Sequence, residues 1–385
     1  MAEKTQTERT TVPQGRHLHL LADRDVQRWY QNLKRSSEIT ADVRLRRLGS
    51  FCEKFHTAPQ NLIQKDPQTI TDILDDAVAV MEAEGYSPGY IKSNLVAVKS
   101  WLDHFGLKPT RRIKIRNADV PVTLADEKVP EREELTEMLV LGSLKARAIK
   151  QVMAKTGVRP QVIGNYRGTD GLRLKDLPEL AITSTGATFL SYPPMMIVRP
   201  ELSKTKQQYF TFLTTSAATT LLTYLNKRIQ SGEKLHPDSP LIPTHSSKRP
   251  FLTSALVSRE VRKSLRPRFT QRPYVFRSFF DTQLLVAEAK GKIPHDFRVF
   301  WMGHKGSIEA RYTTNKHRLP ESLIKEMKAA FKRPEQFLDL ERFQEDEAEK
   351  QRQQIQARVA ELEPEALGQI LELISKISGN TARSK

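Results

Sequence analysis

The stretch from Tyr274 to Tyr312 holds an arginine, a histidine and a tyrosine within apolar sequence of helical character. These three residues are Arg277, His304 and Tyr312. A tyrosine hydroxyl can act as a nucleophile, and fixed cationic donors stabilise the charge that develops when a phosphodiester is attacked. The stretch therefore predicts phosphodiester chemistry at a site that needs further cationic groups from elsewhere in the chain.

Two further cationic candidates lie well before this stretch. Arg159 follows Thr-Gly-Val at the end of an expected helix, and Lys204 lies in a turn, Ser-Lys-Thr-Lys, between two β-rich runs. Taken alone, each candidate has an ordinary structural explanation. Arg159 and Lys204 could be solvated surface cations. His304 could be a histidine whose hydrogen bonds are satisfied within the fold, and Tyr312 a half-buried packing residue. Only the order of these residues along the chain favours a catalytic role over these structural roles.

The composition favours a polyanionic partner. The 385 residues carry a formal net charge of +17, and clustered Lys and Arg gain free energy by releasing counterions from nucleic acid. A membrane surface or plain solubility remains an alternative explanation of the charge. No window approaches the roughly 18 apolar residues of a membrane span, and the N-terminus lacks the apolar run of a signal peptide. The single cysteine, Cys52, lies in an apolar helical stripe and is expected in a core. We expect a soluble intracellular protein of about two domains.

The first half of the chain predicts an all-α domain. Residues 1–16 are expected to be a flexible basic arm, and residues 17–107 carry four stripes at helical spacing, which predict a compact four-helix bundle. Thr40 is the expected cap of the second helix. Residues 108–127 lose the periodicity and are expected to be a basic interdomain linker. Contact with DNA backbone is favoured over a solvated linker for its five cations, Lys108, Arg111, Arg112, Lys114 and Arg116.

The second half predicts a separate domain of mixed α and β structure over residues 128–335. It opens with two helical segments, and residues 181–214 then contain β-rich runs that predict a small antiparallel sheet. A helix is expected at about 217–230. The basic segment 245–272 is expected to follow a DNA groove or phosphate track, with a solvated basic face as the alternative, through Arg259, Arg262, Lys263, Arg266 and Arg268. Residues 336–385 are expected to be a helical tail, either docked on a neighbouring protomer or solvated.

The motifs in this order resemble the tyrosine recombinase (phage integrase) family. They are Thr-Gly-Val-Arg after a helix, a lysine on a β-hairpin, Tyr-x-Phe-Arg, Met-Gly-His, and a tyrosine eight residues past that histidine. The resemblance covers about 128–330, and the helical segment before it is similar to the family's core-binding domain. It implies a mainly α protein with a small antiparallel β-sheet, in which a four-helix core-binding (SAM-like) domain precedes an α+β catalytic domain.

The resemblance also implies roles for single residues. Arg159 and Arg277 would clamp the scissile phosphate, His304 would add a third donor, and Tyr312 would form a covalent 3′-phosphotyrosyl link. Lys204 would protonate the leaving 5′ oxygen, with Lys206 in the same turn as the competing assignment. Two departures stand out. Tyr274 occupies a position where the family usually has histidine, and a phenol is a poor general base at neutral pH. The spacing from His304 to Tyr312 is one residue shorter than in many bacterial members.

The expected function is site-specific DNA recombination by the integrase of a mobile or viral element. The resemblance implies double-stranded attachment sites as partners, a homotetramer on DNA that is weakly associated or monomeric without it, and no metal or other cofactor. The expected location is prokaryotic or viral, cytoplasmic and nucleoid-associated. Three alternatives remain: a Xer-type chromosome-dimer resolvase, a catalytically silent DNA-binding relative, and a type IB topoisomerase.

Overall fold

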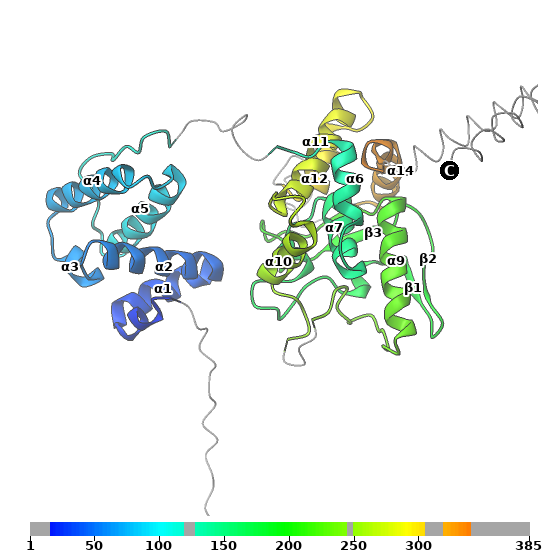
Figure 1. Ribbon diagram of the computed structural model, residues 1–385, viewed down its shortest axis with the longest axis horizontal. Coiled ribbons are helices and arrows are strands. Elements are labelled where there is room, and N and C mark those ends of the chain that lie inside the picture. Colours follow the sequence, from blue (N-terminus) through cyan, green and yellow to red (C-terminus); the bar gives the residue numbers. More distant parts are fainter. Residues whose placement is uncertain (1–15, 119–127, 245–248, 305–318, 340–385) are drawn as a thin grey trace, which may run out of the picture. The chain divides into compact units, whose positions relative to one another are not determined.

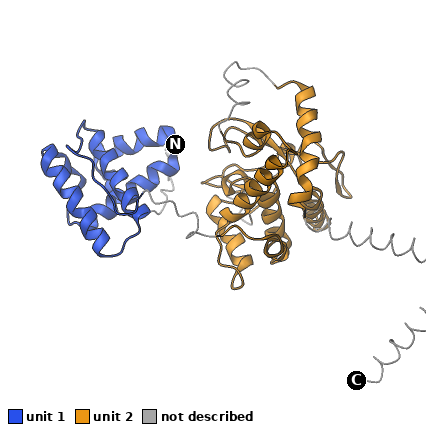
Figure 2. Ribbon diagram, turned by 90° about the horizontal axis from the view of Figure 1, so that it is seen from above, with its two compact units in different colours: residues 1–125 blue, residues 126–385 orange. Residues whose placement is uncertain are grey.

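The computed structural model describes residues 16–118, 128–244, 249–304 and 319–339. The chain divides into two compact units, Met1–Ala125 and Asp126–Lys385 (Figure 2). The first unit is helical over its described part, and the second combines helices with short antiparallel strands (Figure 1). The chain therefore has the mainly α class, with antiparallel β, that the sequence predicts.

The first unit contains the four helices that the stripes predict and two short turns of helix besides. Its elements are η1 (Leu18–Ala22), α1 (Arg24–Ser36), α2 (Glu38–Lys54), α3 (Pro59–Ile63), α4 (Pro67–Ala83) and α5 (Pro88–Asp103). Asp23, Asp66 and Ser87 cap α1, α4 and α5 by accepting backbone N–H groups. The expected cap of α2 was wrong. Ser37, not Thr40, caps this helix, and its side chain accepts the Thr40 N–H.

Two tryptophans join the helices of the first unit. The rings of Trp29 and Trp101 meet edge to face with centroids 5.7 Å apart. Trp101 Nε1 donates to the carbonyl of Pro59 over 2.8 Å, so the indole satisfies its polar atom inside the core. Cys52 is buried among these helices, and burial raises the pKa of its thiol to about 12, as suits a packing residue.

The segment after α5 packs on the first unit as far as Ala118, which differs from the expectation that a linker starts at residue 108. Ile113 is 8% exposed and belongs to the helical core. The backbone N–H of Thr110 donates to Thr71 Oγ1 on α4 over 2.8 Å. Arg111 spans two carboxylates of the same helix, those of Asp72 and Asp75, at 3.0 Å each. Isoleucines that alternate with the cations explain this packing, because they turn one side of the segment toward the core.

The second unit contains the following elements: α6 (Arg132–Val140), α7 (Leu144–Thr156), α8 (Pro160–Ile163), η2 (Leu174–Asp176), β1 (Leu180–Ile182), β2 (Ala187–Phe189), β3 (Met195–Val198), β4 (Tyr209–Phe212), α9 (Thr215–Gln230), α10 (Ser254–Leu265), α11 (Tyr274–Ala289), α12 (His295–Trp301) and α14 (Glu321–Leu338). The strands form two separate antiparallel pairs, β1–β2 and β3–β4. One sheet was expected; Pro193 and Pro194 stand between the two pairs, and proline has no N–H to continue a ladder.

Helix α7 is the centre of the second unit. It packs against α9, α10 and α11, and its lysines Lys150 and Lys155 are buried with the apolar residues. Lys150 Nζ donates to the carbonyls of Met138 and Leu141 at the end of α6, and burial lowers its pKa to about 8. Buried ammonium groups that bond helix-end carbonyls hold α7 at a fixed position, and α7 ends at Thr156, shortly before Arg159.

Helix α14 is packed on this core at both its apolar face and its end. Phe331 lies among Phe212, Phe280 and Trp301, with its ring centroid 5.1 Å from that of Trp301. Asp339, which is 1% exposed, accepts from Thr214 Oγ1 at the start of α9 and lies 3.5 Å from Lys155 Nζ. The segment before the tail is therefore part of the second unit, beyond the boundary at 335 that the sequence suggests.

Candidate active site

Arg159 lies at the end of a tight corner that follows α7. Gly157 ends α7 in the left-handed region, at φ +67°, and Pro160 starts the short helix α8 with Arg159 as its N-cap. The ring of Phe280 on α11 closes over Gly157, where an added Cβ would meet it at 2.4 Å. Glycine is required at this point because it accepts both the φ angle and the contact. The corner thereby brings half-buried Arg159 beside α11.

Arg277 lies inside the protein and joins three segments. Its side chain is 1% exposed. Nη1 donates to the Gly157 carbonyl, and Nη2 donates to the Met302 carbonyl over 2.7 Å and contacts Nε2 of His304 at 2.9 Å. Among the described residues, its Nε has no hydrogen-bond partner. Residues 157, 277 and 302–304, far apart in sequence, thus meet at one guanidinium.

His304 presents a defined tautomer at this contact. An arginine can only donate, so Nε2 of the half-buried imidazole accepts from Arg277 and the ring proton lies on Nδ1. Burial, and then the charge of Arg277, lower the pKa of His304 below 6.5. Arg159 and Arg298 act in the same direction, and Asp281 opposes them. The neutral imidazole is therefore favoured at neutral pH.

The two arginines are electrostatic neighbours. Burial lowers the pKa of Arg277 first, the charge of Arg159 lowers it further, and Tyr209 and Tyr274 oppose the shift. The same Arg159 charge acts on the pKa of His304 and of Tyr209, so its guanidinium lies within range of all three groups. Two neighbouring cations of like charge repel each other, and an anion bound between them would relieve that repulsion.

Tyr274 is the accessible member of the cluster. It starts α11, one helical turn before Arg277, and its side chain is 54% exposed. The Tyr274 hydroxyl raises the pKa of Arg277 as a hydrogen-bond acceptor for the guanidinium, so the phenol lies close to it. The phenol hydroxyl in this place can donate to an anion that Arg277 also faces.

The hairpin with Lys204 and Lys206 is anchored to the segment after Arg159. Its loop spans residues 199–208, and both lysine side chains are exposed. Arg199, at the base of the loop, donates to both carboxylate oxygens of Asp170 at 2.8 and 2.9 Å and to Asp176. Gln161 Nε2, two residues after Arg159, donates to the Leu202 carbonyl over 3.1 Å. The base is fixed while the lysines remain in solvent.

A second anchor holds the helix that precedes His304. Arg298 on α12 pairs with Asp281 at 2.8 Å and with Glu288, both on α11, and Glu288 also contacts His295 at 2.9 Å. These ion pairs fix α12 on the helix that carries Arg277. Within the described ranges, no group of three or more His, Cys, Asp or Glu side chains is placed to hold a metal ion.

The predicted site residues thus divide into three classes. Arg159, Tyr274, Arg277 and His304 come together, Lys204 and Lys206 lie on a tethered loop, and Tyr312 lies outside the described residues. Tyr209 of β4, whose buried phenol interacts with Arg277, was not predicted from the sequence. The anchors Arg199 and Arg298 were not predicted either. No sequence signal marks these residues, because each acts through a partner that is distant along the chain.

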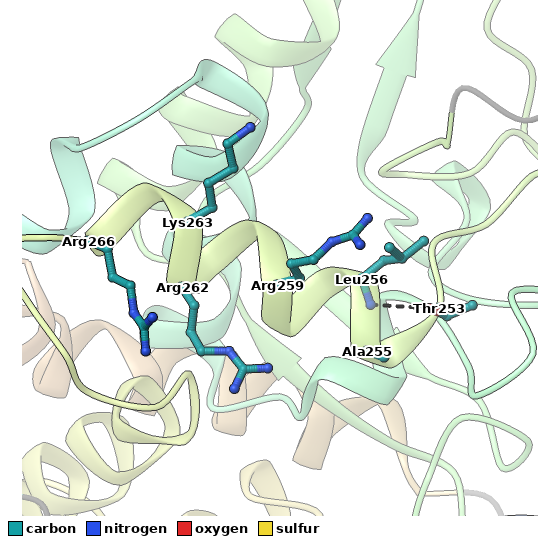
Figure 3. Close-up of a pocket in the computed structure, with 7 residues that line it drawn as sticks. All are labelled: Thr253, Ala255, Leu256, Arg259, Arg262, Lys263 and Arg266. Atoms are coloured by element: carbon teal, nitrogen blue, oxygen red, sulfur yellow. Dashed lines mark hydrogen bonds between the residues drawn. The ribbon is translucent and has the colours of Figure 1, made fainter. Parts of the chain in front are cut away.

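Each unit also has a basic surface of its own. Helix α10 carries Arg262 and Arg266 on one side and Lys263 on another, along a groove that starts at Thr253 (Figure 3). Of the five cations predicted on this segment, Arg268 is paired with Glu137 at 2.6 Å. In the first unit, Arg112 and Lys114 line a groove with Lys92 and Lys99 of α5. Among the described residues, no helix is long and apolar enough to cross a membrane.

No family model matches the sequence, and no curated protein matches it. Solved structures that are similar to this chain include three named recombinases or integrases. XerA recombinase is 18% identical, with 79% of this chain and 96% of that chain covered and a TM-score of 0.34. XerH site-specific recombinase bound to difH substrate is 16% identical, with 78% and 82% covered and a TM-score of 0.44. The Tn1549 transposon integrase in complex with transposon right end DNA is 15% identical, with 78% and 98% covered and a TM-score of 0.43.

Likeness at this level concerns the fold alone, and one fold hosts many functions. The chemistry must therefore follow from the side chains around Arg277.

Proposed function

We propose that the protein is a site-specific DNA recombinase that cleaves and rejoins DNA through a covalent 3′-phosphotyrosine intermediate. One observation carries this proposal: Arg277 joins the corner before Arg159 to His304, so three residues of the recombinase-like motifs share one cationic site. A scissile phosphate between the two guanidinium groups would accept hydrogen bonds from both. Tyr274 would add a donor from the exposed side.

Cleavage would be a transesterification at phosphorus. The Tyr312 oxygen forms a bond to phosphorus, the bond to the 5′ oxygen breaks, and the tyrosine proton leaves to solvent or to a nearby base. Lys204, with Lys206 in the same loop as the alternative, gives a proton to the leaving 5′ oxygen. Arg159 and Arg277 stabilise the charge on the non-bridging oxygens. Rejoining reverses these steps with a 5′ hydroxyl as nucleophile, so the bond energy stays in the phosphotyrosine.

Duplex DNA would be held by the two basic surfaces. The Arg262 and Arg266 side of α10, together with Arg259 and Lys263, would follow a phosphate track next to the site. In the first unit, Arg112 and Lys114 would contact DNA with Lys99, together with Lys108 and Arg116. Arg111 is a weaker candidate for DNA contact because its guanidinium already forms ion pairs with Asp72 and Asp75. Four protomers on two duplexes would complete strand exchange inside a prokaryotic cell or for a viral element.

A trapped covalent adduct tests this function. The substrates are duplexes with a randomised segment and a nick beside it. Cleavage next to the nick releases a short strand, and its loss removes the 5′ hydroxyl that rejoining needs. Protein bound after denaturation is recovered, the attached DNA is sequenced, and the modified peptide is identified by mass spectrometry. We expect a phosphotyrosine at Tyr312, a free 5′ hydroxyl, and no adduct with Tyr312→Phe.

The outcomes separate the alternatives. An adduct that persists in Tyr312→Phe contradicts the nucleophile assignment. DNA binding without any adduct in the wild-type protein indicates a DNA-binding protein without catalysis. Adducts scattered over all sequences, with relaxation of supercoils, indicate a topoisomerase. A single recovered sequence supports a recombinase, and its origin in a mobile element or at a chromosomal dimer-resolution site decides between integrase and Xer-type resolvase.

A further inference from the structure

We propose that Tyr209 is a positioning residue for cleavage, which holds Arg277 and the turn before His304 in register with each other. The proposal rests on the proposed function and assigns a role to a side chain outside the recombinase-like motifs. Tyr209 opens strand β4, pairs with Val198 of β3, and is 6% exposed. It therefore projects inward from the strand that directly follows the loop with Lys204 and Lys206.

The Tyr209 ring lies directly on Gly303. A Cβ placed on Gly303 would come within 2.5 Å of ring atoms Cε1 and Cζ. Gly303 adopts φ +58°, and His304 is the next residue. Only glycine allows both this backbone angle and so close an approach. Packing of the ring on Gly303 thus fixes the position of the turn from which His304 contacts Arg277.

The phenol also lies close enough to Arg277 for the two groups to change each other's pKa. The charges of Arg277 and Arg159, and hydrogen bonding with Arg277, lower the pKa of the Tyr209 hydroxyl. Burial outweighs them and raises the pKa of this tyrosine, so the phenol stays neutral at neutral pH. A neutral phenol that cannot readily ionise is a poor base but a good hydrogen-bond partner for a buried cation.

Tyr209 thereby adds a side-chain support to Arg277 from a fourth segment. The other contacts come from the carbonyls of Gly157 and Met302 and from His304. Without the hydroxyl, Arg277 would keep its place in the core but gain freedom to rotate. Transition-state stabilisation depends on donor placement to a fraction of an ångström, so small displacements cost rate while leaving DNA affinity intact.

The chain offers a matched pair of variants. Tyr209→Phe removes the hydroxyl and keeps the ring on Gly303. Tyr224→Phe removes the hydroxyl of another buried tyrosine, on α9, whose neighbour is Arg228. We expect adduct formation at saturating DNA to be about ten- to a hundredfold slower in Tyr209→Phe, as for the loss of a hydrogen bond to a charged group. DNA affinity should stay within about twofold, and Tyr224→Phe should cleave as the wild-type protein does.

A double-mutant cycle distinguishes positioning from general support of the fold. If Tyr209 acts through Arg277, Tyr209→Phe should slow Arg277→Lys by less than about threefold, while its effect should multiply with that of Lys204→Ala. Equal rates for Tyr209→Phe and wild type overturn the proposal, and so does a fully multiplicative effect with Arg277→Lys.

A measurement without DNA keeps this inference separate from the proposed function. The NMR signal of the His304 ring is titrated in the free protein. We expect its midpoint to rise in Tyr209→Phe, because the Arg277 charge is held less closely, and to stay unchanged in Tyr224→Phe. An unchanged midpoint in Tyr209→Phe contradicts the positioning role even if no DNA is cleaved. Failure of wild-type adduct formation with a shifted midpoint contradicts the proposed function alone.

Discussion

The guanidinium of Arg277 donates a hydrogen bond to Nε2 of His304 across 2.9 Å. The orientation of each side chain therefore depends on the other. The arginine fixes the tautomer of the imidazole, and the neutral imidazole accepts a hydrogen bond from an N–H group that would otherwise be buried without a partner. Arg277 also bonds two backbone carbonyls, so its removal affects the fold and the chemistry together.

Arg277→Ala should lose adduct formation and also destabilise the second unit. The carbonyls of Gly157 and Met302 would be left without their donor, which should lower the free energy of unfolding by about 2–4 kcal/mol. Urea denaturation measures this loss. The control is Arg259→Ala, an exposed arginine of α10, which should change stability by less than about 0.5 kcal/mol. Equal stability of the two variants would contradict the buried role of Arg277.

Protonation of His304 should destabilise the second unit at acid pH. The folded-state pKa lies below 6.5, so between these two values the unfolded chain binds more protons than the folded one. The free energy of unfolding should therefore rise with pH through this window. The stabilising contribution of neutral His304 should be fully present above about pH 6.5, and it should be lost as the pH falls through the folded-state pKa.

Unfolding curves between pH 5 and pH 8 check this sign. His304→Gln should reduce the slope of the unfolding free energy against pH for the second unit. His17, whose pKa burial also lowers, lies in the first unit, so His17→Gln should change only the slope of that unit. A slope that survives His304→Gln unchanged would argue against the assignment.

The anchor of the lysine loop should matter for proton donation and not for binding. Arg199→Ala removes the contacts to Asp170 and Asp176, and we expect cleavage to slow by about tenfold or more at unchanged DNA affinity. A substrate with sulfur at the 5′ bridging position needs no proton on its leaving group. This substrate should restore the cleavage rate of Arg199→Ala. It should also restore the cleavage rate of the variant that lacks the proton donor, which is either Lys204→Ala or Lys206→Ala. No restoration in either lysine variant would exclude both as donors.

The basic face of α10 should govern the salt dependence of DNA binding. For every phosphate that is no longer neutralised, the slope of log affinity against log salt falls by about 0.9. Arg262→Ala combined with Arg266→Ala should therefore lower the slope by up to about 1.8. Arg111→Ala is the comparison, since Asp72 and Asp75 already pair with that arginine, and its effect should be less than half of a single α10 arginine. Affinities measured across a range of salt concentrations would distinguish them.

Local signals in the sequence predict the helices well and the anchors poorly. The Asp66-Pro67 and Ser87-Pro88 pairs mark helix starts that the structure confirms, because caps depend on neighbours in the chain. Motif order likewise predicts that Arg159, Arg277 and His304 belong together. The role of Tyr209 could not be predicted, because it depends on Gly303, which lies far later in the chain. The packing of Ile113 in the core of the first unit could not be predicted either, because its neighbours in the chain are charged and its partners lie on distant helices.

Gly157 determines how much variation the site can tolerate. Every other amino acid at this position would have to adopt φ +67° and also collide with the ring of Phe280. Gly291 has a similar angle, +66°, but nothing within 4 Å, so Gly291→Asn should fold at a cost of about 1 kcal/mol. A saturation library selected for recombination should therefore retain only glycine at 157 while accepting asparagine at 291. Position 157 would then be as invariant as a catalytic position, although its missing side chain never meets the DNA.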